Sequence, residues 1–525
     1  MAPLLLLAFV LSAQDKPPEK CSLSGTVVNS VTGEPLNKVD LVLVPTERSN
    51  RIAAVTTSDS EGRFTMVDLD PGSYHLTGKR NGYLDTAYGA RRPEGDGTVL
   101  RLEAGQGLPE LKLKLMPFGV IAGVVRDSDG EPLNGAHVTV ARLTYEYGKP
   151  RVEGYGDTET DDLGQYRLRG LPPGKYYVGV KPNGDREATR VDHSSGKAAA
   201  EGPVPTVYPG SADASLAAPI EVATGARVGG IDIKMARVRC YTVSGRVATG
   251  AGAGAPAAYI TLRGQERGME LDVPLSTTTR NANGDFELRG VPPGRYQLAA
   301  TRGGSEVAVV PLEVAGNLEG VRAVLGKGAQ VKAGMVMEGG GRVKPERFQV
   351  FLTVNGQSGY FLEAEGDQFA TQNNVAPDRY EVQVERLAAG TYVKSIRSGD
   401  TDVLNDGLTI APGGTVQFEI TLASDAAKVE GTVTNQSDQP GPGATVVLVP
   451  EPKFRARGDL FKTATTDQYG HFEFATVAPG EYKVFAWDDV EPGIWNDPEF
   501  LKEHEKKGAA VTAGAKGHAT VQVKL

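Results

Sequence analysis

The stretch from Gly164 to Val178 reads GQYRLRGLPPGKYYV, and close copies of it recur along the 525-residue chain. The copies are GRFTMVDLDPGSYHL from Gly62 to Leu76, GDFELRGVPPGRYQL from Gly284 to Leu298 and GHFEFATVAPGEYKV from Gly470 to Val484. In each copy, apolar and polar residues alternate on both sides of a proline–glycine pair. Alternation with a period of two, in aromatic and branched residues, indicates half-buried strands. The unit is therefore predicted to be a strand, a tight turn and a second strand.

The proline–glycine pair inside the motif predicts the conformation of the turn. Proline fixes φ and lacks a donor, while glycine accepts the positive φ that the third position of a type II turn needs. The sequence therefore predicts such a turn around Pro173 and Gly174. An Asp or Asn three residues before the first glycine of each copy is expected to start the preceding turn by bonding its own backbone. These residues are Asp59, Asp161, Asn281 and Asp467.

A second pattern opens each repeat: an apolar residue, any residue, glycine, any residue and valine. Its glycines are Gly25, Gly123, Gly245 and Gly431. They precede the turn glycine of the same repeat by 47, 51, 49 and 49 residues. A constant spacing between two anchors indicates that whole domains repeat.

A degraded copy lies between the third and the last repeat. Gly334 and Val336 keep the opening pattern, and APDRY from Ala376 to Tyr380 keeps the turn with Asp378 in place of glycine. We therefore predict an all-β chain, a tandem array of about five antiparallel β-sandwiches of roughly 100 residues each. The expected domains are 22–117, 118–238, 239–328, 329–424 (the divergent copy) and 425–525.

The order of these motifs resembles the carboxypeptidase regulatory-like domain. The resemblance rests on the opening Val-x-Gly-x-Val, a Gly-x-Pro turn, the Asp-x-x-Gly-x-Phe hairpin and the Pro-Pro-Gly-x-Tyr turn, and four of the five repeats match it well. It implies a transthyretin-like Greek-key sandwich, grouped with carbohydrate-binding-like folds. For function it implies little, because members are accessory or surface modules with varied ligands.

The N-terminal residues MAPLLLLAFVLSAQD resemble the apolar core and cleavage region of a secretory signal peptide, although no Lys or Arg precedes the apolar run. We expect a signal peptide at residues 1–14 and a secreted, periplasmic or cell-surface protein; the alternative is an apolar N-terminal strand. No later apolar run reaches the roughly 18 residues of a membrane span. The net charge of −9, spread over the chain, argues against nucleic-acid binding.

The sequence offers no catalytic constellation. None of the six histidines has Glu three positions later, as the zinc carboxypeptidases require, and the run from His504 to Gly508 lacks the second histidine of His-Glu-x-x-His. No Gly-x-Ser-x-Gly or phosphate loop occurs, and the acidic loops 127–130 and 157–162 lack calcium-loop spacing. We therefore expect no enzyme activity, cofactor or metal. Whether Cys21 and Cys240 form a disulfide stays open.

The loop after the last copy of the motif, FAWDDVEPGIWND from Phe485 to Asp497, holds both tryptophans of the chain and four carboxylates. Sugars bind where an aromatic face stacks on their C–H groups and acidic side chains take the hydroxyls. The predicted binding residues are Trp487, Asp488, Asp489 and Trp495. In the alternative, Trp487 continues the strand alternation and the others pack a cap helix predicted from Pro498 to Lys507 with Asp497 as its N-cap.

Equivalent loops elsewhere hold tyrosines, which would form a row of sites if they share one edge of each sandwich. These are Tyr83, Tyr88, Tyr208 and Tyr392. We expect a non-catalytic secreted or cell-envelope binding or adhesion protein, with carbohydrate as the candidate ligand and glycans or envelope proteins as candidate partners. The alternatives are a scaffold or spacer that binds proteins through exposed sheet edges, or an accessory subunit of a separate peptidase.

Overall fold

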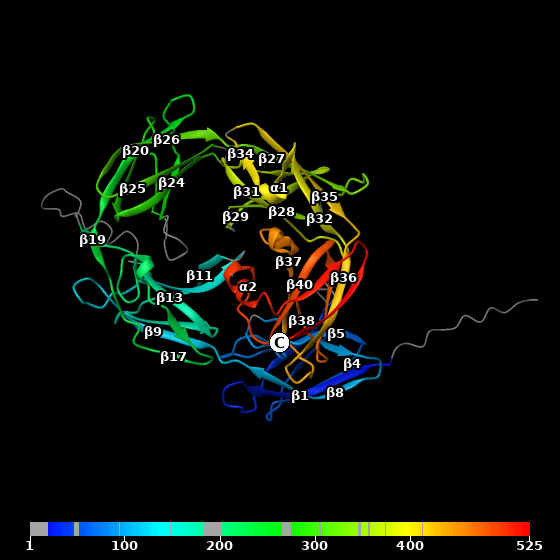
Figure 1. The fold of residues 1–525 in the computed structure, drawn as a ribbon. Coiled ribbons are helices and arrows are strands. Elements are labelled where there is room, and N and C mark those ends of the chain that lie inside the picture. Colours follow the sequence, from blue (N-terminus) through cyan, green and yellow to red (C-terminus); the bar gives the residue numbers. More distant parts are fainter. Residues whose placement is uncertain are drawn as a thin grey trace, which may run out of the picture. The chain divides into compact units, whose positions relative to one another are not determined.

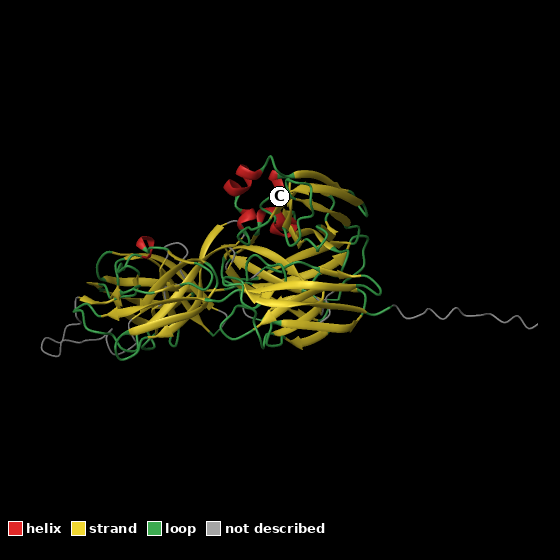
Figure 2. Ribbon diagram, turned by 90° about the horizontal axis from the view of Figure 1, so that it is seen from below, coloured by secondary structure: helices red, strands yellow, loops and turns green. Residues whose placement is uncertain are grey.

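The structure is a computed structural model, and it describes residues 19–46, 52–93, 95–146, 149–181, 201–264, 275–303, 306–344, 348–354, 357–372, 374–411 and 413–525. The predicted signal peptide at residues 1–14 lies outside these ranges. Internal contacts divide the chain into two compact units, Met1–Pro117 and Phe118–Leu525, and each is described by itself. Figure 2 shows that strands dominate the described chain and that helix is confined to short segments. The predicted all-β array of Greek-key sandwiches is confirmed.

The first unit contains one sandwich (Figure 1). One sheet has the order β4-β1-β8, and the other has the order β3-β2-β5-β6, with β7 also paired to β5. The bounds are β1 (Cys21–Asn29), β2 (Asp40–Pro45), β3 (Ala54–Thr57), β4 (Arg63–Leu69), β5 (Gly72–Lys79), β6 (Thr86–Ala87), β7 (Leu100–Leu102) and β8 (Gly107–Leu115). The core between the sheets holds the alternating apolar residues of the motif, such as Phe64 and Leu76.

The second sandwich opens the second unit. Its sheets have the orders β12-β9-β17, with β18 also paired to β9, and β11-β10-β13-β15, with β16 also paired to β13; β14 and β19 form a separate pair. The bounds are β9 (Gly119–Arg126), β10 (His137–Glu146), β11 (Lys149–Glu159), β12 (Gln165–Leu171), β13 (Gly174–Lys181), β14 (Glu201–Pro203), β15 (Thr206–Val207), β16 (Ile220–Val222), β17 (Arg227–Val228), β18 (Ile233–Lys234) and β19 (Arg237–Arg239).

In the third and fourth sandwiches the two layers are joined into one continuous strand order. The orders are β22-β21-β24-β25-β26-β20-β23 and β33-β32-β35-β27-β30-β29-β28-β31-β34. The third has β20 (Tyr241–Thr249), β21 (Tyr259–Gly264), β22 (Leu275–Thr278), β23 (Asp285–Val291), β24 (Gly294–Arg302), β25 (Glu306–Val314) and β26 (Leu318–Lys327). The fourth has β27 (Gln330–Met337), β28 (Gln349–Val354), β29 (Gln357–Glu365), β30 (Gln368–Thr371), β31 (Asp378–Glu385), β32 (Tyr392–Ser398), β33 (Thr401–Asp402), α1 (Val403–Asp406), β34 (Leu408–Ile410) and β35 (Thr415–Ala423).

The fifth sandwich has sheets of the orders β39-β36-β42 and β38-β37-β40-β41. Its elements are β36 (Ala427–Thr434), β37 (Thr445–Pro450), β38 (Lys462–Thr465), β39 (His471–Val477), β40 (Gly480–Trp487), α2 (Pro498–His504), β41 (Ala509–Ala513) and β42 (His518–Lys524), with 3-10 turns η3 (Pro452–Phe454), η4 (Gly458–Leu460) and η5 (Ile494–Asn496). A separate large buried apolar cluster lies within each of the five predicted repeats. The clusters agree with the five-domain division, whose boundaries stay a prediction.

The first and last strands of every sandwich pair in parallel, while their other neighbours are antiparallel. The parallel pairs are β1–β8, β9 with β17 and β18, β20–β26, β27–β35 and β36–β42. The sequence did not predict this feature, because alternation within a strand reports which face is buried and not the direction of its neighbour.

The glycine of the opening pattern is explained by this parallel pair. A Cβ added to Gly25, Gly245 or Gly431 would come closer than 3.0 Å to a carbonyl oxygen of the last strand, and a Cβ on Gly123 would come as close to the carbonyl oxygen of Ile231, just before β18; real Cβ atoms do not come so close. Only glycine permits so close an approach of two backbones. In the divergent fourth sandwich a Cβ on Gly334 would meet nothing within 4 Å.

The proline–glycine turn differs from the sequence prediction. Gly174 does not have a positive φ, so the predicted type II turn is wrong. The positive φ lies four residues earlier, at Gly170 (φ 77°), where the pairing of β12 with β9 shifts its register. The turn glycine instead leaves room for a packed side chain: a Cβ on Gly174 would lie 3.2 Å from Arg142 Nε, and a Cβ on Gly480 would lie 3.3 Å from the Tyr482 ring.

The tyrosine of the motif is a structural anchor in all five sandwiches. Its hydroxyl donates to the carbonyl oxygen four residues earlier, at 2.7–3.0 Å; the residues are Tyr74, Tyr176, Tyr296, Tyr380 and Tyr482. The ring is buried and the hydroxyl is satisfied, which is the arrangement of a tyrosine corner. The predicted Asp and Asn turns are confirmed as well; Asp467, for example, accepts from the amides of Tyr469 (2.9 Å) and His471 (2.8 Å).

Candidate functional site

The predicted binding loop lies between β40 and α2. Trp487 is the last residue of β40, Trp495 is in η5, and both are half-buried, whereas Asp488 and Asp489 are exposed. The helix begins as predicted, because the Asp497 side chain accepts from the amide of Glu499 at 2.9 Å. It ends at His504, three residues before the predicted Lys507.

Both tryptophans pack beneath the helix. They contact a small buried cluster that includes Phe485 and Leu501. The Trp487 ring stacks on Phe485 with centroids 5.6 Å apart and also meets Phe500 (5.8 Å) and His504 (6.0 Å) of α2. The structure therefore assigns the tryptophans a packing role. A sugar could stack only on the part of the Trp487 ring that Phe485, Phe500 and His504 leave uncovered.

A charged cluster fixes the end of α2 to β40. Glu505 accepts hydrogen bonds from Lys483 (2.8 Å) and Arg455 (2.9 Å). Partial burial by itself raises the pKa of Glu505, but these two hydrogen bonds outweigh it and hold that pKa below the usual 4.5. The Trp loop is thus built on an anchored helix.

The tyrosines of the equivalent loops also pack against cores. Tyr83 and Tyr88 are half-buried against the first cluster, and Tyr208 is half-buried against the second. Tyr392, on β32 of the fourth sandwich, packs against the core of the fifth. Its hydroxyl donates to Asp425 Oδ1 at 3.0 Å. Burial and this hydrogen bond raise the pKa of Tyr392.

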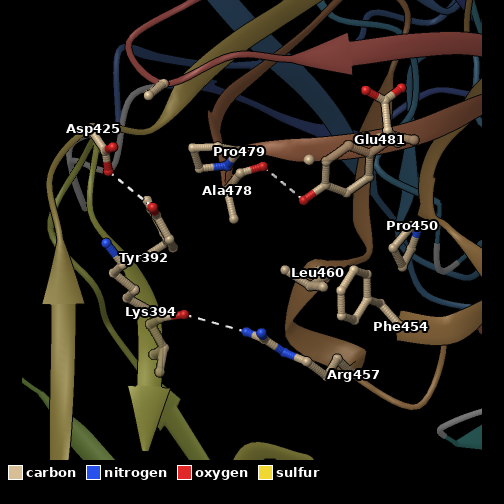
Figure 3. A pocket seen from close by; sticks show the side chains of 14 residues that line it. Tyr392, Lys394, Asp425, Pro450, Phe454, Arg457, Leu460, Ala478, Pro479 and Glu481 are labelled. Atoms are coloured by element: carbon tan, nitrogen blue, oxygen red, sulfur yellow. Dashed lines mark hydrogen bonds between the residues drawn. The ribbon is translucent and has the colours of Figure 1, made fainter.

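Tyr392 lines a pocket of about 350 Å³ within the second unit (Figure 3). The fourth sandwich contributes β32, and the fifth contributes the turn from Ala478 to Tyr482 together with the segment between β37 and β38, which carries Phe454 and Arg457. Burial raises the pKa of Tyr482 to about 12, so its hydroxyl stays protonated and keeps donating to the turn.

The cations at the pocket are paired. Arg457 forms an ion pair with Asp459 at 2.6 Å and donates to the carbonyl oxygen of Val393 at 3.3 Å. Lys394 forms an ion pair with Glu338. The pocket therefore combines aromatic walls with charges that are already compensated.

The sequence did not single out Phe454 or Arg457. Neither belongs to the repeated motif, and the signal available was the stretch from Pro452 to Phe461, whose aromatic and charged residues interrupt two strands. Tyr392 was named, as a loop aromatic. The repeat motif itself supplies one pocket wall, from Ala478 to Tyr482.

The structure also bears on metal ligands, on the two cysteines and on membrane spans. In the part of the chain that the structure describes, no three His, Cys, Asp or Glu side chains are grouped to hold a metal ion. Cys21 and Cys240 are free cysteines. None of the described helices is long and apolar enough to cross a bilayer.

A family model for the carboxypeptidase regulatory-like domain matches residues 22–109, 120–201, 242–326 and 428–492, which is more than half of the chain. The chain belongs to the carboxypeptidase regulatory-like domain family. The family's domain occurs four times along the chain. The family model does not match the divergent fourth sandwich, in which the glycine of the opening pattern, Gly334, has no close contact.

Several solved structures are similar at low identity. The Bacillus anthracis TIE protein is 17% identical over 58% of this chain and 50% of that chain, with a TM-score of 0.17. A streptococcal ancillary pilin is 12% identical over 58% and 99% (TM-score 0.21), and BcpA, the major pilin subunit of Bacillus cereus, is 9% identical over 59% and 100% (TM-score 0.16). The chain thus spans half the length of the TIE protein. Such TM-scores do not establish a shared arrangement of domains. No curated protein matches the sequence.

Proposed function

We propose that this array of carboxypeptidase regulatory-like domains is a non-catalytic binding or adhesion protein of the cell envelope or exterior, and that its ligand is a carbohydrate. The observation that carries the proposal is the loop after β40, in which the exposed Asp488 and Asp489 lie in the sequence between the half-buried Trp487 and Trp495. Carboxylates take sugar hydroxyls, and indole edges and faces pack on sugar C–H groups. The secretory-type N-terminus supports the location.

A glycan array with the purified full chain tests this function. Because the tryptophans also pack α2, their replacement could disturb the loop, so the main variant is the double substitution Asp488→Asn, Asp489→Asn. Glu503→Gln, an exposed carboxylate on α2, is the matched control. We expect glycan binding by the wild type and the control, and about a tenfold loss in the double variant. Absence of wild-type binding would refute the carbohydrate function.

A second function, a scaffold that binds proteins by strand addition, has an observation in its favour. Among the described strands, β11 pairs only with β10 and is an edge strand of 11 residues. Tyr155 on β11 is 42% exposed. Edge strands with open backbone groups accept a further strand, and lysine on them prevents it. A pull-down from envelope extract that retains a partner with the wild type and loses it with Tyr155→Lys would favour this function over glycan binding.

A further inference from the structure

The fourth and fifth sandwiches contact each other through specific hydrogen bonds and packing, and this contact region is called the joint. The guanidinium of Arg457, in the fifth, donates to the carbonyl oxygen of Val393 in the fourth at 3.3 Å. The amide of Gly390 donates to Thr476 Oγ1 at 3.1 Å. Tyr392 packs its ring on the core of the fifth sandwich and bonds Asp425 in the connecting segment. Side-chain and backbone bonds therefore fix this junction, in addition to the covalent linker.

The hollow of about 350 Å³ lies in this joint (Figure 3). Figure 3 shows Tyr392 on one side, Phe454 and Leu460 opposite, Pro479 above and Arg457 reaching across below. The volume is at the lower end of the roughly 300–1,000 Å³ typical of small-molecule sites. A ligand of one or two rings fits such a space better than an extended chain does.

The charges around the hollow select against an ionic ligand. Arg457 is paired with Asp459 and Lys394 with Glu338, so neither cation offers its full charge to an anion. Asp425 and Glu481 already accept hydrogen bonds, from Tyr392 and from Thr512 Oγ1 (2.8 Å) respectively. The balance of charges at the walls favours a neutral ligand.

The same groups select against a purely apolar ligand. Such a molecule would take Asp425 and Arg457 out of water without offering them a hydrogen bond, which is costly. A neutral ligand with many hydroxyls satisfies them, because hydroxyls donate to carboxylates and accept from guanidinium. Phe454, which is 36% exposed, offers a ring face for the apolar side of such a molecule.

We propose that the joint between the fourth and fifth sandwiches is a carbohydrate site that takes one or two sugar rings, with Phe454 and Tyr392 as its aromatic walls and Asp425 as its main hydroxyl acceptor. The inference rests on the carbohydrate function proposed above, and it adds a second binding site, in this joint and separate from the Trp loop. A sugar held there contacts both sandwiches.

The test measures binding of the full chain to a glycan array and then, by calorimetry, to the mono- or disaccharide with the strongest signal. The variants are Phe454→Ala and Asp425→Asn, the second of which keeps an oxygen that can accept the bond from Tyr392. Tyr469→Ala is the matched control, since Tyr469 is a 44% exposed aromatic of the same sandwich outside the pocket lining. We expect Phe454→Ala and Asp425→Asn each to weaken binding at the joint about tenfold, with the control unchanged.

The outcomes separate the two proposals. Binding that is lost in the Asp488→Asn, Asp489→Asn variant and kept in both joint variants would overturn the joint site and leave the carbohydrate function standing. A wild-type chain that binds no glycan would overturn the function, and the joint site with it. Thermal melting of each variant shows whether it is folded, and Asp425→Asn decides the matter if Phe454→Ala is not.

Discussion

The fourth and fifth sandwiches are neighbours in the chain that share the repeated motifs but differ in the contacts of the opening glycine. In the fifth, Gly431 lies against a carbonyl oxygen of β42, and the family model matches the sequence. In the fourth, Gly334 has open space, and the family model does not match. Both keep the tyrosine hydroxyl bond, at Tyr380 and Tyr482. The tyrosine anchor is therefore more basic to the fold than the glycine contact.

The fourth sandwich has also gained an element. β32 pairs with β35 and covers the edge that β42, its counterpart in the fifth, leaves unpaired among the described strands. The same strand carries Tyr392 into the core of the fifth sandwich. Divergence of the fourth repeat and formation of the joint thus involve the same strand.

The largest expected difference in stability between the two sandwiches comes from substitution of their opening glycines. Gly431→Ala drives a Cβ into a backbone carbonyl and should cost about 3 kcal/mol or more, because the backbone must move. Gly334→Ala should change stability by less than about 0.5 kcal/mol. Hydrogen exchange of the full chain, read on the peptides of β36 and β27, measures both. Equal losses would contradict the role assigned to the close contact.

A smaller loss is expected from a buried hydroxyl. Thr466, fully buried, donates to the carbonyl of Gly441 (2.6 Å) and accepts from the amide of Ala444 (2.8 Å). Thr466→Val keeps the shape and leaves both groups unsatisfied, so it should cost the fifth sandwich about 2 kcal/mol. Thr463→Val on β38, at an exposed position, is the control and should be nearly neutral. Denaturant unfolding followed by fluorescence of the two tryptophans, both in this sandwich, gives the values.

The shared tyrosine anchor should respond alike in both sandwiches. Tyr380→Phe and Tyr482→Phe each remove one hydroxyl bond to a carbonyl oxygen and should each cost about 1 kcal/mol. Hydrogen exchange on β31 and β40 measures the pair. A loss confined to the fifth sandwich would show that the fourth has replaced this anchor with other contacts.

The smallest effect depends on pH and belongs to the fifth sandwich alone. The folded-state pKa of Glu505 is lowered, so its contribution to stability is present above about pH 4.5 and is lost as the pH falls through the folded pKa. Since Glu505 is one-third exposed, we expect less than about 1 kcal/mol. Glu505→Gln should flatten the pH dependence of tryptophan-detected melting between pH 7 and 4, and Glu503→Gln should not. An unchanged profile in Glu505→Gln would assign the pH dependence to other carboxylates.

The sequence predicted the scaffold well, because scaffold positions repeat. Alternation around Tyr482, the Asp467 turn and the fixed distance from Gly431 are local patterns copied four times, and each reflects burial or a short-range hydrogen bond. The turn conformation predicted at Gly174 was wrong, since proline–glycine pairs permit several backbone geometries and the proline and glycine do not report which side chain, here Arg142, packs against the turn.

The joint pocket could not be predicted in the same way. Phe454 and Arg457 lie in a segment without a repeat, and they meet Tyr392 only because two sandwiches dock. For Trp487, alternation along β40 gave the packing interpretation and loop composition gave the binding one. The structure shows the packing contacts, and binding stays a proposal.

The parallel pairing of first and last strands has a mechanical consequence. Because β36 and β42 run in the same direction, the chain enters the fifth sandwich at one end and leaves at the other. A pull on the two chain ends of such a sandwich acts along these strands and in opposite directions. Their hydrogen bonds are then loaded in shear and must fail together, whereas antiparallel terminal strands would unzip one bond at a time. Every sandwich of the array has this geometry. Tension on the chain ends of a sandwich therefore loads its parallel terminal strands in shear, the direction in which they resist separation most strongly.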